Sequence, residues 1–217
     1  MKERIAAELR RDDLSTATEF RVLSSVSDIH DAILSAIEMY QHKRFYFNES
    51  RTITFLTTAL QARYGENDDT DIARIIKFDY VTATVAGEPY ELTPMAPNEA
   101  EVAVSSGINR GQPEFYSYYG QEIVLAPIPV DDDWAIRVGA VISQPAPASD
   151  SEANNVWMTK AERLIRATAK MELYLHVIKD IEAANTQKAI ADDALARLNE
   201  RMFNLAVMGD GLVEAWG

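Results

Sequence analysis

The spacing of apolar residues changes from helical to strand-like and back to helical as the chain proceeds. Residues 25–41 and 159–206 carry apolar side chains at steps of three and four, the period of an amphipathic helix. Between them, residues 45–143 contain short β-branched and aromatic runs separated by turn residues. Because the helical and strand-like parts are segregated and do not alternate, we predict an α+β fold: a helical core with a β-rich insertion.

The first helical part has one apolar face. Ser25 followed by Asp28 resembles a capping box, so we expect the helix to begin there. Residues 42–44 are basic and suit the C-terminal end of a helix. A short helix or arm is expected earlier, near residues 5–9. The expected buried face consists of Val26, Ile29, Ile33, Ile37 and Tyr40.

The middle of the chain predicts several strands joined by tight turns. We expect strands at residues 45–47, 51–56, 72–85, 90–92, 115–118, 123–125 and 134–142. The first two are expected to form a hairpin across the turn at residues 48–50. The next two are expected to pair across residues 87–89, and the strands flanking Gly120 to pair with each other. Residues 97–104 predict a short helix that begins at Pro97.

The C-terminal third is predicted to be helical after a Pro-, Ala- and Ser-rich linker at residues 145–155. Thr159 and Glu162 form a capping box, so a helix is expected to begin there. Its expected apolar stripe is Leu164, Met171, Leu175 and Ile178, and a break is expected near Asp180. A second helix to about residue 206 has the stripe Ala191, Leu195, Leu198, Met202 and Leu205.

We expect one domain over residues 1–207 and a C-terminal arm over residues 208–217. Gly209 and Gly211 are expected to end the last helix. The apolar residues beyond them are unfavourable in water, so the arm either folds back or docks on a neighbour by strand addition or an aromatic anchor. The residues expected to contact a partner are Leu205, Val207, Met208, Leu212, Val213 and Trp216.

The sequence carries no motif that predicts chemistry. Phosphate-binding and dinucleotide-binding loops are missing, and a chain without cysteine has no thiolate ligand or nucleophile. His30, His42 and His176 are not at metal-ligand spacing, and His176 is expected to be a half-buried or salt-bridged helix residue. We therefore expect no catalytic residue, no cofactor and no metal.

Two acidic runs, residues 68–71 and 131–133, leave an enzymatic alternative open. The first lacks the alternating ligands and central glycine of a calcium loop, so both are expected to be solvated turns. A hydrolase that uses these loops would lose turnover on Asp69→Asn or Asp132→Asn.

The charge balance argues against direct nucleic-acid binding. The formal net charge is −13, whereas phosphate contacts need clustered Lys and Arg. The simplest interpretation of this charge is solubility. No apolar run is long enough to cross a bilayer, and the charged N-terminus does not resemble a signal peptide.

Three stretches together resemble a known family. They are residues 33–49, which end in Tyr-Gln-His-Lys-Arg-Phe-Tyr-Phe-Asn-Glu; residues 111–116 with 119–129; and Trp157 followed by residues 164–176. In this order and spacing, the chain is similar over most of residues 14–205 to the head–tail adaptor (neck connector) proteins of tailed bacteriophages.

The resemblance implies a structural virion protein without enzymatic activity, made in the bacterial cytoplasm and located in the virion neck. Such subunits form a ring, usually twelve-fold, between the portal protein and the tail or nozzle protein, and continue the DNA channel. About a dozen copies would sum to about −150 charges, which would let DNA slide without sequence-specific binding. No membrane partner is implied. The alternative is another phage structural protein, such as a head-completion or minor tail subunit.

Overall fold

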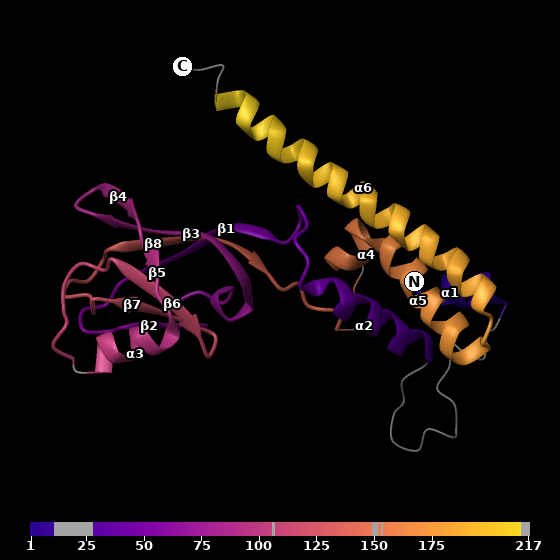
Figure 1. Cartoon of the computed structure of the whole chain (residues 1–217), viewed down its shortest axis with the longest axis horizontal. Coiled ribbons are helices and arrows are strands. Elements are labelled where there is room, and N and C mark those ends of the chain that lie inside the picture. The colour runs from indigo at the N-terminus through magenta and orange to yellow at the C-terminus, as the bar shows by residue number, and fades with distance from the viewer. Residues whose placement is uncertain (11–27, 106, 149–151, 153, 214–217) are drawn as a thin grey trace. The chain divides into compact units, whose positions relative to one another are not determined.

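The computed structural model describes residues 1–10, 28–105, 107–148, 152 and 154–213 (Figure 1). The chain divides into two compact units. The helical unit comprises residues 1–47 and 144–217, and the β unit is residues 48–143, inserted between them in sequence. The predicted α+β class, with a helical core and a β-rich insertion, is confirmed.

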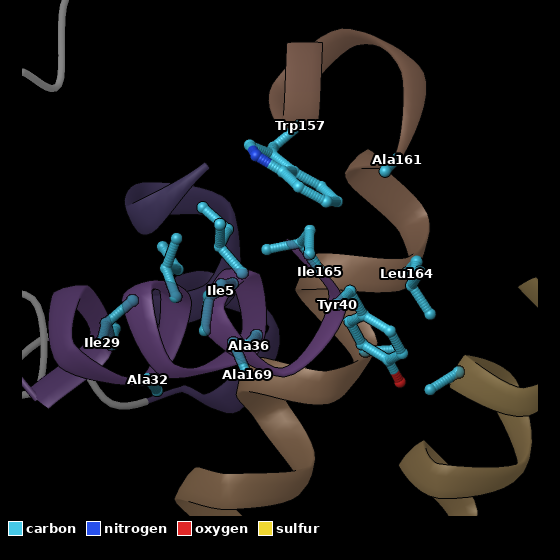
Figure 2. Close-up of a cluster of buried hydrophobic side chains, with 14 of the residues drawn as sticks. Ile5, Ile29, Ala32, Ala36, Tyr40, Trp157, Ala161, Leu164, Ile165 and Ala169 are labelled. Carbon is cyan, nitrogen blue, oxygen red and sulfur yellow. The ribbon is translucent and has the colours of Figure 1, made fainter. Parts of the chain in front are cut away.

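The helical unit buries the described residues of the face that the sequence periodicity predicted for residues 25–41. Its elements are α1 (Lys2–Leu9), α2 (Asp28–Gln41), α4 (Val156–Lys160), α5 (Glu162–Glu172), the π-helix η3 (Leu173–Ile178) and α6 (Ile181–Val213). Ile29, Ile33, Ile37 and Tyr40 of α2 are buried as expected, whereas Val26 and Ser25 lie outside the described residues. Figure 2 shows this core, in which the small side chains of Ala36 and Ala169 let α2 approach α5 closely.

Trp157 is the largest fully buried side chain of this core. Its ring packs edge-on against Phe45 and Phe47, with centroids 6.1 and 5.5 Å away. Its indole Nε1–H donates to the Gln144 carbonyl at 3.0 Å, so the polar edge of the ring is also satisfied. The short helix α1 joins this unit partly through Glu8, which accepts from Lys170 Nζ at 2.8 Å. That hydrogen bond lowers the pKa of the Glu8 carboxyl.

The helix starts in the C-terminal third differ from the prediction. The capping box at Thr159 is wrong, because α4 begins at Val156 and the Asn155 side chain caps it, accepting from Trp157 N at 3.0 Å. Thr159 instead donates its hydroxyl to the Asn155 carbonyl at 3.1 Å. The expected break near Asp180 is confirmed: Lys179 is left-handed with φ 61°, and Asp180 accepts from Ala183 N at 2.9 Å.

The π-helix explains why the predicted stripe on this helix is only partly right. Leu164 is buried, but Leu175 is 43 % exposed. The wider turn from Leu173 onward shifts the phase of later residues relative to a regular α-helix. Leu173 takes the buried position instead.

The described residues of the β unit form two four-stranded sheets and one α-helix. Sheet A has the order β1 (Glu49–Leu56), β8 (Ala135–Ile142), β3 (Ile75–Val85) and β4 (Glu88–Glu91). Sheet B has the order β2 (Arg63–Tyr64), β7 (Glu122–Ala126), β6 (Phe115–Tyr119) and β5 (Thr93–Pro94). A 3-10 turn, η2 (Ile72–Arg74), precedes β3, and α3 (Pro97–Ser105) follows β5. One core joins both sheets, with Val138 and Ile136 from sheet A and Ile123 and Leu125 from sheet B.

The predicted β hairpins are partly confirmed. β3 pairs with β4 and β6 with β7, both antiparallel, as the turns at residues 87–89 and at Gly120 indicated. The helix at Pro97 is confirmed as well. The first hairpin is wrong: Phe45 is buried in the helical core, and β1 pairs with β8 instead. The described residues of the expected linker form neither helix nor strand and lie next to the boundary between the units.

Candidate interaction surface

The helix α6 has a first part that is packed along α5. Ala184, Ala191 and Ala194 are buried against the helical core, so the small residues set a close helix–helix contact. Arg163, at the start of α5, pairs with Asp193 at 2.9 Å. The two helices therefore run antiparallel, and residues of α6 beyond Asp193 pass the start of α5.

The length of α6 exceeds that of its partner. α6 has 33 residues, whereas α5 and η3 have 11 and 6. At about 1.5 Å per residue, α6 is roughly 50 Å long and its partner about half of that. In Figure 1 the C-terminal part of α6, in yellow, accordingly continues past α5.

Among the side chains that the structure describes, the last packed positions of α6 lie near residue 202. The Arg201 guanidinium sits 4.5 Å from the centre of the Tyr46 ring, and Met202 is half-buried. The next residue, Phe203, is 67 % exposed. This exposed phenylalanine lies on the part of α6 beyond Asp193, past the start of α5.

The helix continues through the glycines that were expected to end it. α6 extends to Val213 and includes both Gly209 and Gly211, so the predicted helix end is wrong. Glycine costs only about 1 kcal/mol in a helix relative to alanine, so two glycines do not by themselves end one. Five of the predicted partner residues, Leu205, Val207, Met208, Leu212 and Val213, therefore lie on α6, and their side chains lie outside the description. Trp216 lies outside the described residues.

A second apolar surface lies at the turn between η3 and α6. Leu175, Val177 and Ile181 are 43 %, 40 % and 67 % exposed. His176 lies between the first two and is exposed too, so the expectation that it is half-buried or salt-bridged is not met. The sequence does not predict this surface, because a regular helical period assigns Leu175 to the core.

The acidic loops use their carboxylates to hold backbone. Asp68 Oδ2 accepts from Gly65 N at 2.8 Å. Asp69 accepts from Thr54 N at 3.2 Å and from Asp71 N at 2.9 Å. Asp132 Oδ1 accepts from Ala59 N at 2.6 Å. These are loop-stabilising roles, in which each carboxylate accepts from backbone amides.

In the described part of the chain, the histidines and carboxylates do not form a metal-binding group. Over the described residues, three or more His, Asp or Glu side chains never converge as metal ligands would. His30 lies on α2, His176 on η3, and His42 is exposed just after α2.

A polar cluster that the sequence did not predict lies on sheet B of the β unit. Glu101 of α3 accepts from Arg63 Nη2 and from the Tyr119 hydroxyl. Arg63 also lies over the Tyr119 ring, 5.3 Å from its centre, and pairs with Glu122 at 3.4 Å. The hydrogen bonds from Tyr119 and Arg63 lower the pKa of Glu101. Burial raises the pKa of Tyr119, and the bond to Glu101 raises that of Arg63.

Neither the known protein-family models nor the curated proteins give a match to the sequence. Among the described residues, the helices are either too short or too polar to span a membrane.

Proposed function

We propose that the protein is a head–tail adaptor subunit that forms a ring beneath the portal of a tailed bacteriophage. The observation that carries this proposal is α6, a helix that begins in the bundle and continues past it with an exposed apolar residue, Phe203. A helical unit interrupted by a β-rich insertion is also what the sequence resemblance implies. The function is structural and needs no chemistry.

Two separate apolar surfaces on one unit favour ring assembly. One is the turn with Leu175, Val177 and Ile181, and the other is Phe203 on the part of α6 that continues past α5. Different surfaces that meet head to tail make heterologous contacts, which form rings when the rotation between subunits closes. In this proposal α6 is the arm that docks on the portal. The central opening of the ring continues the DNA channel to the tail or nozzle protein.

The net charge fits a channel through which DNA passes without sequence-specific binding. A charge of −13 for each copy, summed over a ring, repels the phosphate backbone. DNA in such a channel is guided and not held. In this proposal the mature protein resides in the virion neck.

The test mixes the purified protein with the portal ring from its own genome, followed by negative-stain imaging and sedimentation. We expect a ring that is coaxial with the portal and has a fixed ratio of subunits. A protein that enters virions without ring stoichiometry or portal binding would be a head-completion or minor tail subunit, and the adaptor assignment would be wrong.

A matched pair of variants locates the docking surface. Phe203→Asp places a charge at an exposed apolar position, whereas Asn204→Asp places the same charge at the neighbouring exposed polar position. We expect the first variant to weaken portal binding by about tenfold or more and the second to leave it nearly unchanged. Equal effects of the two would show that the end of α6 is not in the interface.

A further inference from the structure

The two faces of sheet B are covered by different parts of the β unit. Ile123 and Leu125 belong to the core shared with sheet A. Their neighbours point the other way, because side chains alternate along a strand. The antiparallel register pairs Ser117 with Val124 and Tyr119 with Glu122, so these four residues share the opposite face. Helix α3 contacts β6 and β7 and covers this opposite face of sheet B.

Little apolar surface holds α3 in this position. Of its nine residues, all of which are described, Ala100 alone is buried. Val102 on the same helix is 75 % exposed. Beneath the helix, Val124 and Ser117 are 0 % and 2 % exposed. The buried Ser117 hydroxyl finds no hydrogen-bond partner within the described part of the chain, which makes the covered state costly.

An ionic contact supplies what the apolar packing lacks. The Glu101 carboxylate of α3 is bound by Arg63 from β2 and by the Tyr119 hydroxyl from β6. The remaining charged group at this contact is Glu122 of β7, which pairs with Arg63 at 3.4 Å. We call the contact of Glu101 with Arg63 and Tyr119 the Glu101 latch.

The chain on either side of α3 is anchored by backbone hydrogen bonds. On one side, Met95 N donates to the Tyr116 carbonyl at 2.7 Å. On the other, Gly111 N donates to the Ile128 carbonyl at 2.9 Å, and Ile128 N donates to the Asn109 carbonyl at 3.0 Å. The helix can therefore leave the sheet while both of its ends stay attached.

We propose that α3 is a hinged flap that the Glu101 latch keeps closed on sheet B, and that breaking the latch opens the flap and uncovers Val124 and Ser117. This inference is independent of the proposed adaptor function. Partly exposed ion pairs are weak, so the closed state is only modestly favoured and open states are reached readily.

The latch also sets a direction for the effect of pH. Tyr119 and Arg63 hold the pKa of Glu101 below its usual range, so the carboxylate stays ionised and the flap closed at neutral pH. As the pH falls through this lowered pKa, the protonated carboxyl loses its pairing with Arg63 and the flap opens.

Hydrogen exchange of the whole chain, read by mass spectrometry, tests the flap. Glu101→Ala removes the latch and leaves an excellent helix former, so faster exchange cannot come from lower helix propensity. Glu99→Ala, at an exposed position of the same helix, is the matched control. We expect peptides covering residues 97–105 to exchange roughly fivefold faster in Glu101→Ala than in Glu99→Ala, the effect of an ion pair at the strong end of its range.

A second variant breaks the latch from the opposite side. Arg63→Met should accelerate hydrogen exchange in the same peptides. Both substitutions remove the same contact between Glu101 and Arg63, so the double variant should exchange no faster than the faster single variant. Peptides of β3 and β8 should keep the wild-type exchange rate in all of them. Equal rates in Glu101→Ala and Glu99→Ala, additive effects of the two latch variants, or acceleration of β3 and β8 as well would each overturn the proposal.

Discussion

At the scale of the residue, one position in the β unit depends on having no side chain. Gly139 of β8 is the cross-strand partner of Tyr80 on β3. A Cβ placed on Gly139 would lie only 2.6 Å from Tyr80 Cζ. We expect Gly139→Ala to destabilise the protein by about 1–3 kcal/mol, the usual cost of overpacking, measured by urea unfolding.

Two companion variants separate this clash from a general effect of glycine replacement. A Cβ on Gly65 would meet the Glu122 Cγ at an ordinary 3.4 Å, so Gly65→Ala should change stability by about 0.5 kcal/mol or less. In a Tyr80→Ala background the ring is gone, and Gly139→Ala should lose most of its cost. If Gly139→Ala lost as much stability in the Tyr80→Ala background, the loss would come from the backbone of β8 and not from the clash with the ring.

Residue types alone identified few of the polar roles. The acidic runs were correctly predicted to be turns, but the sequence did not show that Asp69 and Asp132 accept from backbone amides of distant segments. Nor could it place Glu101 beside Arg63 and Tyr119, because these residues come from three elements that meet only in the folded sheet.

At the scale of the element, sequence patterns predicted those features that depend on residues close together in the chain. The periodic face of α2 and the hairpins β3–β4 and β6–β7 followed from spacing and turn residues. The partner of β1 did not, because β8 lies far along the chain and the nearby residue Phe45 is taken by the helical core. The exposed Leu175 was missed for a related reason, since one π-turn changes the phase of the face.

The C-terminal half of α6 allows a test with opposite outcomes for the two interpretations of its glycines. In a continuous helix, Gly209→Ala and Gly211→Ala should each stabilise it by up to about 1 kcal/mol. In a left-handed cap, the same changes would destabilise the end. We expect slower hydrogen exchange in peptides covering residues 203–213, and faster exchange in the control Ala206→Gly. Faster exchange in the alanine variants would show that the glycines end the helix, as the sequence predicted.

At the scale of the whole molecule, the two units have separate cores. Trp157 and Phe45 belong to the helical unit, whereas Tyr64 and Ile123 belong to the core of the β unit. The β unit also begins and ends at one place, because Ile142 N donates to the Asn48 carbonyl at 2.9 Å. A chain that leaves a domain close to where it enters can lose that domain without stretching what remains.

We therefore expect the helical unit to fold when residues 48–143 are replaced by a flexible linker of about four Gly and Ser residues. The excision removes Trp134, and with Trp216→Phe also introduced, Trp157 becomes the reporter of the helical core. The shortened protein should show helical circular dichroism, a blue-shifted tryptophan emission and one cooperative unfolding transition. The matched control is the same excision with Trp157→Ala, which should lose about 3–5 kcal/mol through the cavity it leaves. A shortened chain without a cooperative transition would mean that the helical unit depends on the β unit, and that the insertion is part of one folding unit.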